Sequence, residues 1–115
     1  MTDEDVRGVI EHGTRHLEFC MRLYRMQVRN GLYFLHEHPA GASSWQDSWV
    51  LRLLRHSDVR SVVSDHCEYG LATHNKDGQL MPAQKPTRWM TSSPQMAARL
   101  SARCSRTHKH EPLLG

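Results

Sequence analysis

The chain has 115 residues, 38% hydrophobic and 23% charged, so it can form one small domain but not two domains that each have a core. No run of about 18 apolar residues occurs, which excludes a membrane-spanning helix, and the composition is not that of a collagen, a low-complexity chain or a disulfide scaffold. With three cysteines and an acidic start that leads into no apolar block, we expect an intracellular protein, in the nucleus or the cytoplasm, whose thiols are free or metal-bound.

The net charge of +3 is unevenly distributed along the chain. Residues 1–40 and 41–84 each carry a net charge of −1, whereas residues 85–115 carry six basic residues against one Glu, a net charge of +5. Twelve of the fifteen cations are Arg, whose planar group makes paired contacts with phosphate or carboxylate. The pattern favours a basic C-terminal face near nucleic acid, while a solvated helix surface explains the same charges.

The first predicted element is a long amphipathic helix. Its apolar residues recur at spacings of three, four or seven and form one stripe, which we expect to pack in the core: Val6, Ile10, Leu17, Met21, Tyr24 and Val28. The helix should begin after an N-cap at Thr2 or Asp3 and end at the Asn30-Gly31 pair.

The elements expected after this helix are shorter. They are a buried strand over 32–36, a helix from 42 to about 56, a strand over 59–63, a hairpin or loop around 76–78, a strand over 87–91 and a helix from 94 to about 103. This order predicts an α/β fold: a partial Rossmann-like three-layer sheet of about three or four short strands with a long N-terminal helix and two further helices. We expect a single domain over 1–104, followed by a polar, His-containing tail over 105–115.

Glu37 is the first candidate site residue. It lies where the first predicted strand ends and precedes Pro39, a position that suits general-acid work or hydrogen bonding to a planar polar ligand. Alternatively, Glu37 caps the next helix or pairs with an Arg. His36 and His38 flank it and form either a metal pair or two exposed loop residues.

A second candidate site combines Lys85 and Arg88 with a turn stiffened by Pro86. Two cations beside such a turn can grip a phosphate, and the alternative is a surface loop with solvated cations.

A third group contains the ligand types that zinc prefers. Two thiolates and two imidazoles can complete a tetrahedral zinc site, and the candidates are Cys67, Cys104, His108 and His110. A flexible, histidine-rich terminus is the alternative.

Other catalytic motifs are missing from the sequence. It has no Gly-rich phosphate loop, no Ser-centred nucleophile elbow and no His-Glu-x-x-His pair. The sequence therefore does not favour an enzyme whose active site lies entirely within this chain.

The order of motifs over 37–41, 69–71 and 84–88 resembles the later half of a cytosine-C5 DNA methyltransferase catalytic domain. The resemblance implies that Glu37 is the catalytic glutamate that holds the target cytosine and that Arg88 is an active-site arginine; Gly41 and Gln84 match further motif positions. The sequence departs from the family where His38 replaces an asparagine and Pro86 replaces the first arginine.

A closer resemblance is to methyltransferase-like segments of retroelement polyproteins, which lie beside reverse transcriptase and integrase. It covers the blocks 36–45, 67–70, 85–88 and 104–110. It implies DNA or another nucleic acid as partner, together with the remainder of the parent domain or polyprotein. The expected nucleic-acid contacts are Lys85, Arg88, Arg99 and Arg103.

The parent family uses S-adenosylmethionine and a Pro-Cys nucleophile. Neither the glycine-containing cofactor loop nor that nucleophile has a counterpart here, since no proline precedes Cys20, Cys67 or Cys104. We therefore expect no S-adenosylmethionine in this chain and a truncated, catalytically inactive fragment. The alternative is a small zinc-stabilised nucleic-acid-binding module, and a third option is a fragment that docks an exposed sheet edge on a partner.

Overall fold

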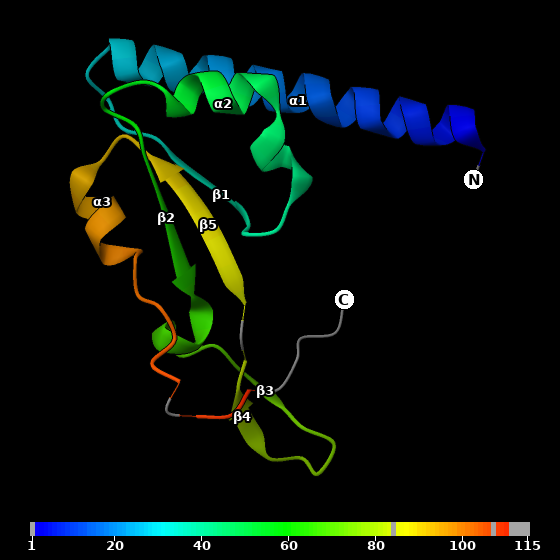
Figure 1. Ribbon diagram of the computed structural model, residues 1–115, viewed down its shortest axis with the longest axis vertical. Helices are drawn as coiled ribbons and strands as arrows, with labels where there is room; N and C mark the ends of the chain where they lie inside the picture. The colour runs from blue at the N-terminus through cyan, green and yellow to red at the C-terminus, as the bar shows by residue number, and fades with distance from the viewer. Residues whose placement is uncertain (1, 84, 107, 111–115) are drawn as a thin grey trace.

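A computed structural model describes residues 2–83, 85–106 and 108–110 of the chain (Figure 1). The elements follow in the order α1 (Asp3–Arg29), β1 (Leu35–Pro39), the 3-10 helix η1 (Ser43–Gln46), α2 (Ser48–Leu54), β2 (Arg60–Asp65), the 3-10 helix η2 (His66–Tyr69), β3 (Ala72–His74), β4 (Leu80–Pro82), β5 (Pro86–Thr91) and α3 (Pro94–Arg99). The mixture of helices and strands confirms the predicted long N-terminal helix and two further helices.

The strands form two antiparallel sheets. The larger has the order β1-β5-β2, so β5 is central and runs antiparallel to both neighbours, and the smaller is the β3–β4 hairpin. The pairing observed among the described residues thus differs from the parallel pairing of a Rossmann sheet. The hairpin turn contains Gly78 at φ 79°, a conformation that glycine adopts without strain, which confirms a turn at this position.

Helix α1 begins and ends where the sequence predicts. The Asp5 amide donates to the Thr2 hydroxyl at 3.1 Å and the Thr2 amide donates to the Asp5 carboxylate at 3.0 Å, which is a capping box. At the other end Asn30 is the C-cap and Gly31 follows at φ 70°.

The predicted apolar stripe of α1 is buried only in part. Met21 is fully buried, but Val6 and Ile10 are exposed, so their assignment to the core is wrong. The physical reason is that α2 and the sheet lie along the C-terminal half of α1, while its N-terminal half extends beyond them (Figure 1).

Three other boundaries differ from the prediction. The strand expected at 32–36 lies at 35–39, because its register with β5 begins at the Leu35–Thr91 pair. The helix expected at 42–56 is divided into η1 and α2, because Asp47 is extended and caps α2. The last helix ends at Arg99 rather than near 103, because the chain then runs along the end of β2, where Asp65 binds Ala102.

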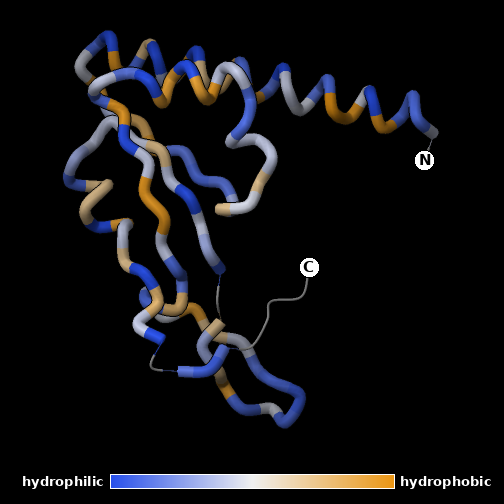
Figure 2. Tube along the Cα trace, viewed as in Figure 1, coloured by the Kyte–Doolittle hydropathy of each residue, from blue (hydrophilic) through white to orange (hydrophobic). Residues whose placement is uncertain are grey.

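The apolar core lies between helices α1 and α2 and the sheet. Its buried members come from α1, η1, α2 and β5 and from the loops before β1 and β2: Met21, Phe34, Trp45, Val50, Leu53, Val59 and Met90. The β3–β4 hairpin and the segment after α3 lie at the opposite end of the sheet (Figure 1), and polar stretches predominate there (Figure 2). None of the described helices has the length and apolar character needed to cross a membrane.

Candidate metal centre

Four side chains predicted as metal ligands meet at the end of the sheet away from the core. Cys67 lies on η2, directly after β2, while Cys104, His108 and His110 lie on the segment that follows α3. One ligand atom from each residue falls within 4.8 Å of the others, and all four residues are half-buried. The cluster can hold a metal ion such as zinc.

Three sulfur–nitrogen distances within the cluster are close to those of a tetrahedral ion site, whereas Nε2 of His108 and Nε2 of His110 are closer together, at 2.9 Å. The sulfur of Cys104 lies 3.5 Å from Nε2 of His108 and 3.3 Å from Nε2 of His110. Nε2 of His110 is also 3.3 Å from the Cys67 sulfur. With Zn–S near 2.3 Å and Zn–N near 2.0–2.1 Å, the edges of a ligand tetrahedron are roughly 3.3–3.8 Å long.

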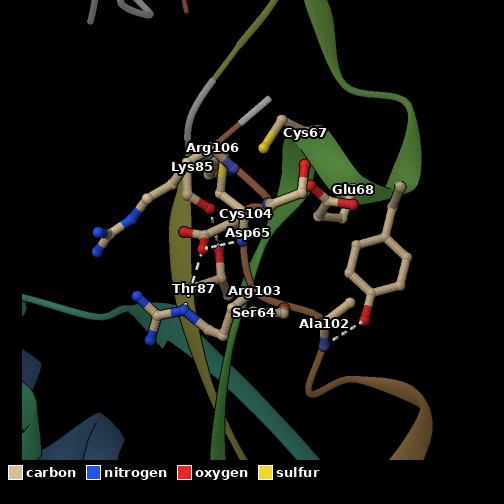
Figure 3. A network of polar contacts seen from close by, with 12 residues as sticks. Ser64, Asp65, Cys67, Glu68, Lys85, Thr87, Ala102, Arg103, Cys104 and Arg106 are labelled. Carbon is tan, nitrogen blue, oxygen red and sulfur yellow. Dashed lines mark hydrogen bonds and ion pairs between the residues drawn. The ribbon is translucent and has the colours of Figure 1, made fainter. Parts of the chain in front are cut away.

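Backbone contacts bring the two ligand-bearing segments together. The Asp65 amide donates to the Ala102 carbonyl at 2.9 Å, and the Ala102 amide donates to the Tyr69 hydroxyl at 3.1 Å. That hydroxyl in turn donates to the Arg99 carbonyl at 2.7 Å. These bonds hold the segment after α3 against β2 and η2, and so place Cys104 beside Cys67 (Figure 3).

Asp65 binds the segment that carries Cys104. Its side chain is 2% exposed, and Oδ2 accepts the Cys104 amide at 2.7 Å and Nε of Arg103 at 3.0 Å (Figure 3). Burial alone would raise the pKa of Asp65, but these hydrogen bonds and the Arg103 charge outweigh it and keep the pKa below its ordinary value. The other oxygen, Oδ1, is buried without a hydrogen-bond partner among the described residues.

Metal binding at this cluster would be coupled to the loss of protons. Burial and the adjacent Cys104 raise the pKa of Cys67 to about 11, so without an ion its thiol stays protonated at neutral pH. A thiol must lose its proton to bind a metal, and metal binding therefore releases protons here.

The structure does not bring Glu37 and Arg88 together. Residues directly opposite in an antiparallel pair share a face, and neighbours along a strand alternate between faces. Glu37 is opposite Trp89, whereas Arg88 is opposite His38. Glu37 is therefore exposed on one face of the sheet and Arg88 projects from the other.

Arg88 is occupied by contacts within the fold. Its guanidinium carbon lies 4.4 Å from the centre of the Trp45 ring, and Nε donates to the Ser61 hydroxyl at 2.6 Å. Lys85 and Arg99 are exposed, and Arg103 binds Asp65. Gln84, which the resemblance singled out, lies outside the described residues.

His36 and His38 are engaged in the fold rather than in a metal cluster. Their rings stack with centres 4.8 Å apart. Nδ1 of His36 is 3.0 Å from the Tyr24 hydroxyl, and Nδ1 of His38 is 2.8 Å from the Ser44 hydroxyl. Burial and the neighbouring His38 lower the pKa of His36 to about 4, so this ring is neutral at physiological pH.

Sequence reasoning missed two parts of the site: Asp65, and Arg106, whose amide donates to the Cys104 sulfur at 3.4 Å. Both adjoin predicted ligands in the chain, because Asp65 is two positions before Cys67 and Arg106 two positions after Cys104. An Asp close to the end of a predicted strand is a sequence signal that could have indicated Asp65. The contact between Asp65 and Cys104 joins distant segments and needed the tertiary structure.

Comparisons with protein-family models, curated proteins and solved structures find no match for this chain.

Proposed function

We propose that the protein is a small zinc-stabilised nucleic-acid-binding module. The observation that carries the proposal is the meeting of two thiols and two imidazoles, whose ligand atoms lie within 4.8 Å of one another. With four protein ligands such a site has no open position for a substrate, which is typical of structural rather than catalytic zinc. Zinc would thus join the segment after α3 to the end of β2.

The charge distribution supports nucleic acid as the partner. The ligands Cys104, His108 and His110 belong to the region 85–115, whose net charge is +5. Exposed cations of this region adjoin the ligands, namely Lys85, Arg103, Arg106 and Lys109. Cations clustered at one site neutralise phosphates and release counterions, which gives binding that weakens as salt rises.

The resemblance to methyltransferase-like segments of retroelement polyproteins stays a separate prediction. It implies an inactive fragment of a Rossmann-like domain, with S-adenosylmethionine bound by the parent rather than by this chain. The opposite faces of Glu37 and Arg88 do not favour a shared active site within the chain. In the parent-length protein, unchanged cytosine methylation after Glu37→Gln would refute the role of Glu37.

The metal part of the proposal is tested by measuring the zinc content of the purified chain. We expect about one zinc per chain, with near-complete loss in Cys104→Ser. Cys20→Ser is the matched control, because Cys20 lies on α1 outside the cluster, and this variant should keep its zinc. Zinc-free wild-type protein, or equal zinc in both variants, would contradict the proposal.

The nucleic-acid part is tested with the zinc-loaded chain and a fluorescent oligonucleotide. We expect binding whose logarithmic affinity falls linearly with the logarithm of the salt concentration between about 50 and 200 mM. No binding at about 50 mM salt would refute this part and leave the metal part standing.

A further inference from the structure

We propose that Arg103 and Arg106 form a clamp for one phosphate group of a nucleic-acid backbone, and that the metal centre holds this clamp in shape. The inference rests on the proposed function and names the place where that function would be carried out. It also predicts which cations of the basic region do not take part.

A hollow of about 340 Å³ lies beside the metal ligands and is large enough for a phosphate group. Its walls are formed by the supporting carboxylate, two arginines and three of the ligands: Asp65, Arg103, Cys104, Arg106, His108 and His110. The hollow is therefore continuous with the metal centre.

Arg103 is oriented for a phosphate by its partner inside the protein. Nε donates to the buried Asp65 carboxylate at 3.0 Å, while the side chain remains 62% exposed (Figure 3). The Nη1 and Nη2 groups lie at the outer end of the guanidinium, and a fork of this kind matches two phosphate oxygens. Because its orientation is already fixed, less side-chain freedom is lost on binding.

Arg106 is tied to the metal centre through its own backbone. Its φ of 62° places it in the left-handed region, which is uncommon for a residue with a side chain. Its amide lies 3.4 Å from the Cys104 sulfur and donates to it. A metal-bound thiolate is a better acceptor than a thiol, so metal binding should strengthen this contact and fix the backbone from which the Arg106 side chain extends.

The charges that line the hollow suit a phosphodiester. A zinc ion with two thiolates and two neutral imidazoles has no net charge. Asp65 and Arg103 offset each other, and Arg106 leaves one positive charge. A phosphodiester carries one negative charge, so the occupied hollow would be neutral.

The other cations of the region make less suitable partners. Arg88 packs on Trp45 and binds Ser61 on the helix-covered face of the sheet. Arg99 ends α3, where its carbonyl accepts the Tyr69 hydroxyl, and it does not line the hollow. Lys85 and Lys109 are exposed but do not line the hollow either. The clamp therefore consists of Arg103 and Arg106.

The test measures how the affinity of the full zinc-loaded chain for a fluorescent oligonucleotide depends on salt. Each of Arg103→Gln and Arg106→Gln should weaken binding to all sequences and lower the magnitude of the logarithmic salt slope by about 0.7 to 0.9. Arg7→Gln is the matched control, because Arg7 is exposed on α1 at the far end of the molecule, and it should leave the slope unchanged. Zinc content is measured for every variant to show that the centre is intact.

Removal of zinc provides the second arm of the test. Relative to the zinc-loaded wild type, the zinc-free wild type should show the same decrease in affinity and in the magnitude of the salt slope as the Arg106→Gln variant. If the wild type binds but both arginine variants keep its slope, the clamp is refuted while the nucleic-acid module stands. If the wild type binds no oligonucleotide, the clamp and the nucleic-acid proposal both fail, and the zinc content still decides the metal centre.

Discussion

The side chain of Asp65 binds two parts of the segment that carries three of the candidate ligands. It binds the Cys104 amide and Arg103 through one oxygen, while its buried second oxygen has no partner among the described residues. Ligating histidines commonly donate their second ring nitrogen to a carboxylate. In this protein the carboxylate holds a ligand through its backbone instead, at the Cys104 amide.

We predict that Asp65→Asn lowers the zinc affinity by about 10- to 100-fold, as loss of such a supporting carboxylate does in other metal sites. Asn keeps the shape and one carbonyl acceptor for the Cys104 amide, but it loses the charge and the second acceptor. Competition with a chelator of known affinity measures the change. Asp58→Asn serves as control, because Asp58 is an exposed residue outside the metal centre, and equal affinities for the two variants would rule out the supporting role.

His36 gives a prediction for the pH dependence of stability. Its pKa is about 4 in the folded protein, against an ordinary value of 6.5. Between these values the unfolded chain binds a proton that the folded chain does not, so the free energy of unfolding falls as the pH drops from about 6.5 toward 4. Above 6.5 both states are neutral and the contribution is fully present. The full loss is at most about 3 kcal/mol.

Urea denaturation at a series of pH values, with chelator present throughout, measures this dependence. His36→Asn should show a shallower fall than the wild type over the same range, because the other histidines are common to both proteins. Parallel curves for the two proteins would show that His36 does not carry the effect.

Among the secondary-structure elements, α2 depends most clearly on one residue. The Asp47 carboxylate accepts the amides of Trp49 at 2.9 Å and Val50 at 3.3 Å, and α2 supplies two core residues, Val50 and Leu53. Loss of an N-cap costs about 1 kcal/mol. We predict that Asp47→Ala lowers the free energy of unfolding by this amount in urea denaturation, whereas Asp47→Asn, which keeps a capping oxygen, changes it little.

Element boundaries were predictable where the signal was local. The N-cap of α1, the Asn30-Gly31 end and the Ser93-Pro94 start of α3 are short-range patterns, and all three are confirmed. The start of β1 was misplaced because its register depends on β5, which is about fifty residues further along the chain. The break at Asp47 was missed because residues 42–56 also fit one amphipathic helix.

The whole molecule is flat and extended. Its extents are 48 × 44 × 17 Å and its radius of gyration is 17.0 Å, whereas a compact domain of this length has a radius of about 13 Å. The apolar core lies at the α1–α2 end, whereas polar stretches predominate around the hairpin (Figure 2), where the Cys/His cluster lies. The two ends of the molecule therefore depend on different interactions.

We predict that removal of zinc lowers amide protection at the hairpin end of the molecule and leaves it unchanged at the α1–α2 end. Hydrogen exchange after chelation should become faster at the amides of residues 66–83 and 100–106, because zinc is proposed to join these two segments. The amides of α2 and of the C-terminal half of α1 should keep their protection, because the apolar core holds them. Uniform loss of protection would mean that the metal supports the entire fold.

The sequence by itself determined the kinds of element, the ends of α1 and the identity of the four metal-ligand candidates, because caps, periodicity and ligand chemistry are properties of neighbouring residues. The tertiary structure alone decided the antiparallel sheet, the separation of Glu37 from Arg88 and the role of Asp65. Strand pairing fixes which face a side chain occupies, and a shift of one residue reverses it. The hydrogen bonds of Asp65 likewise join β2 to the segment after α3, a contact that neighbouring residues do not encode.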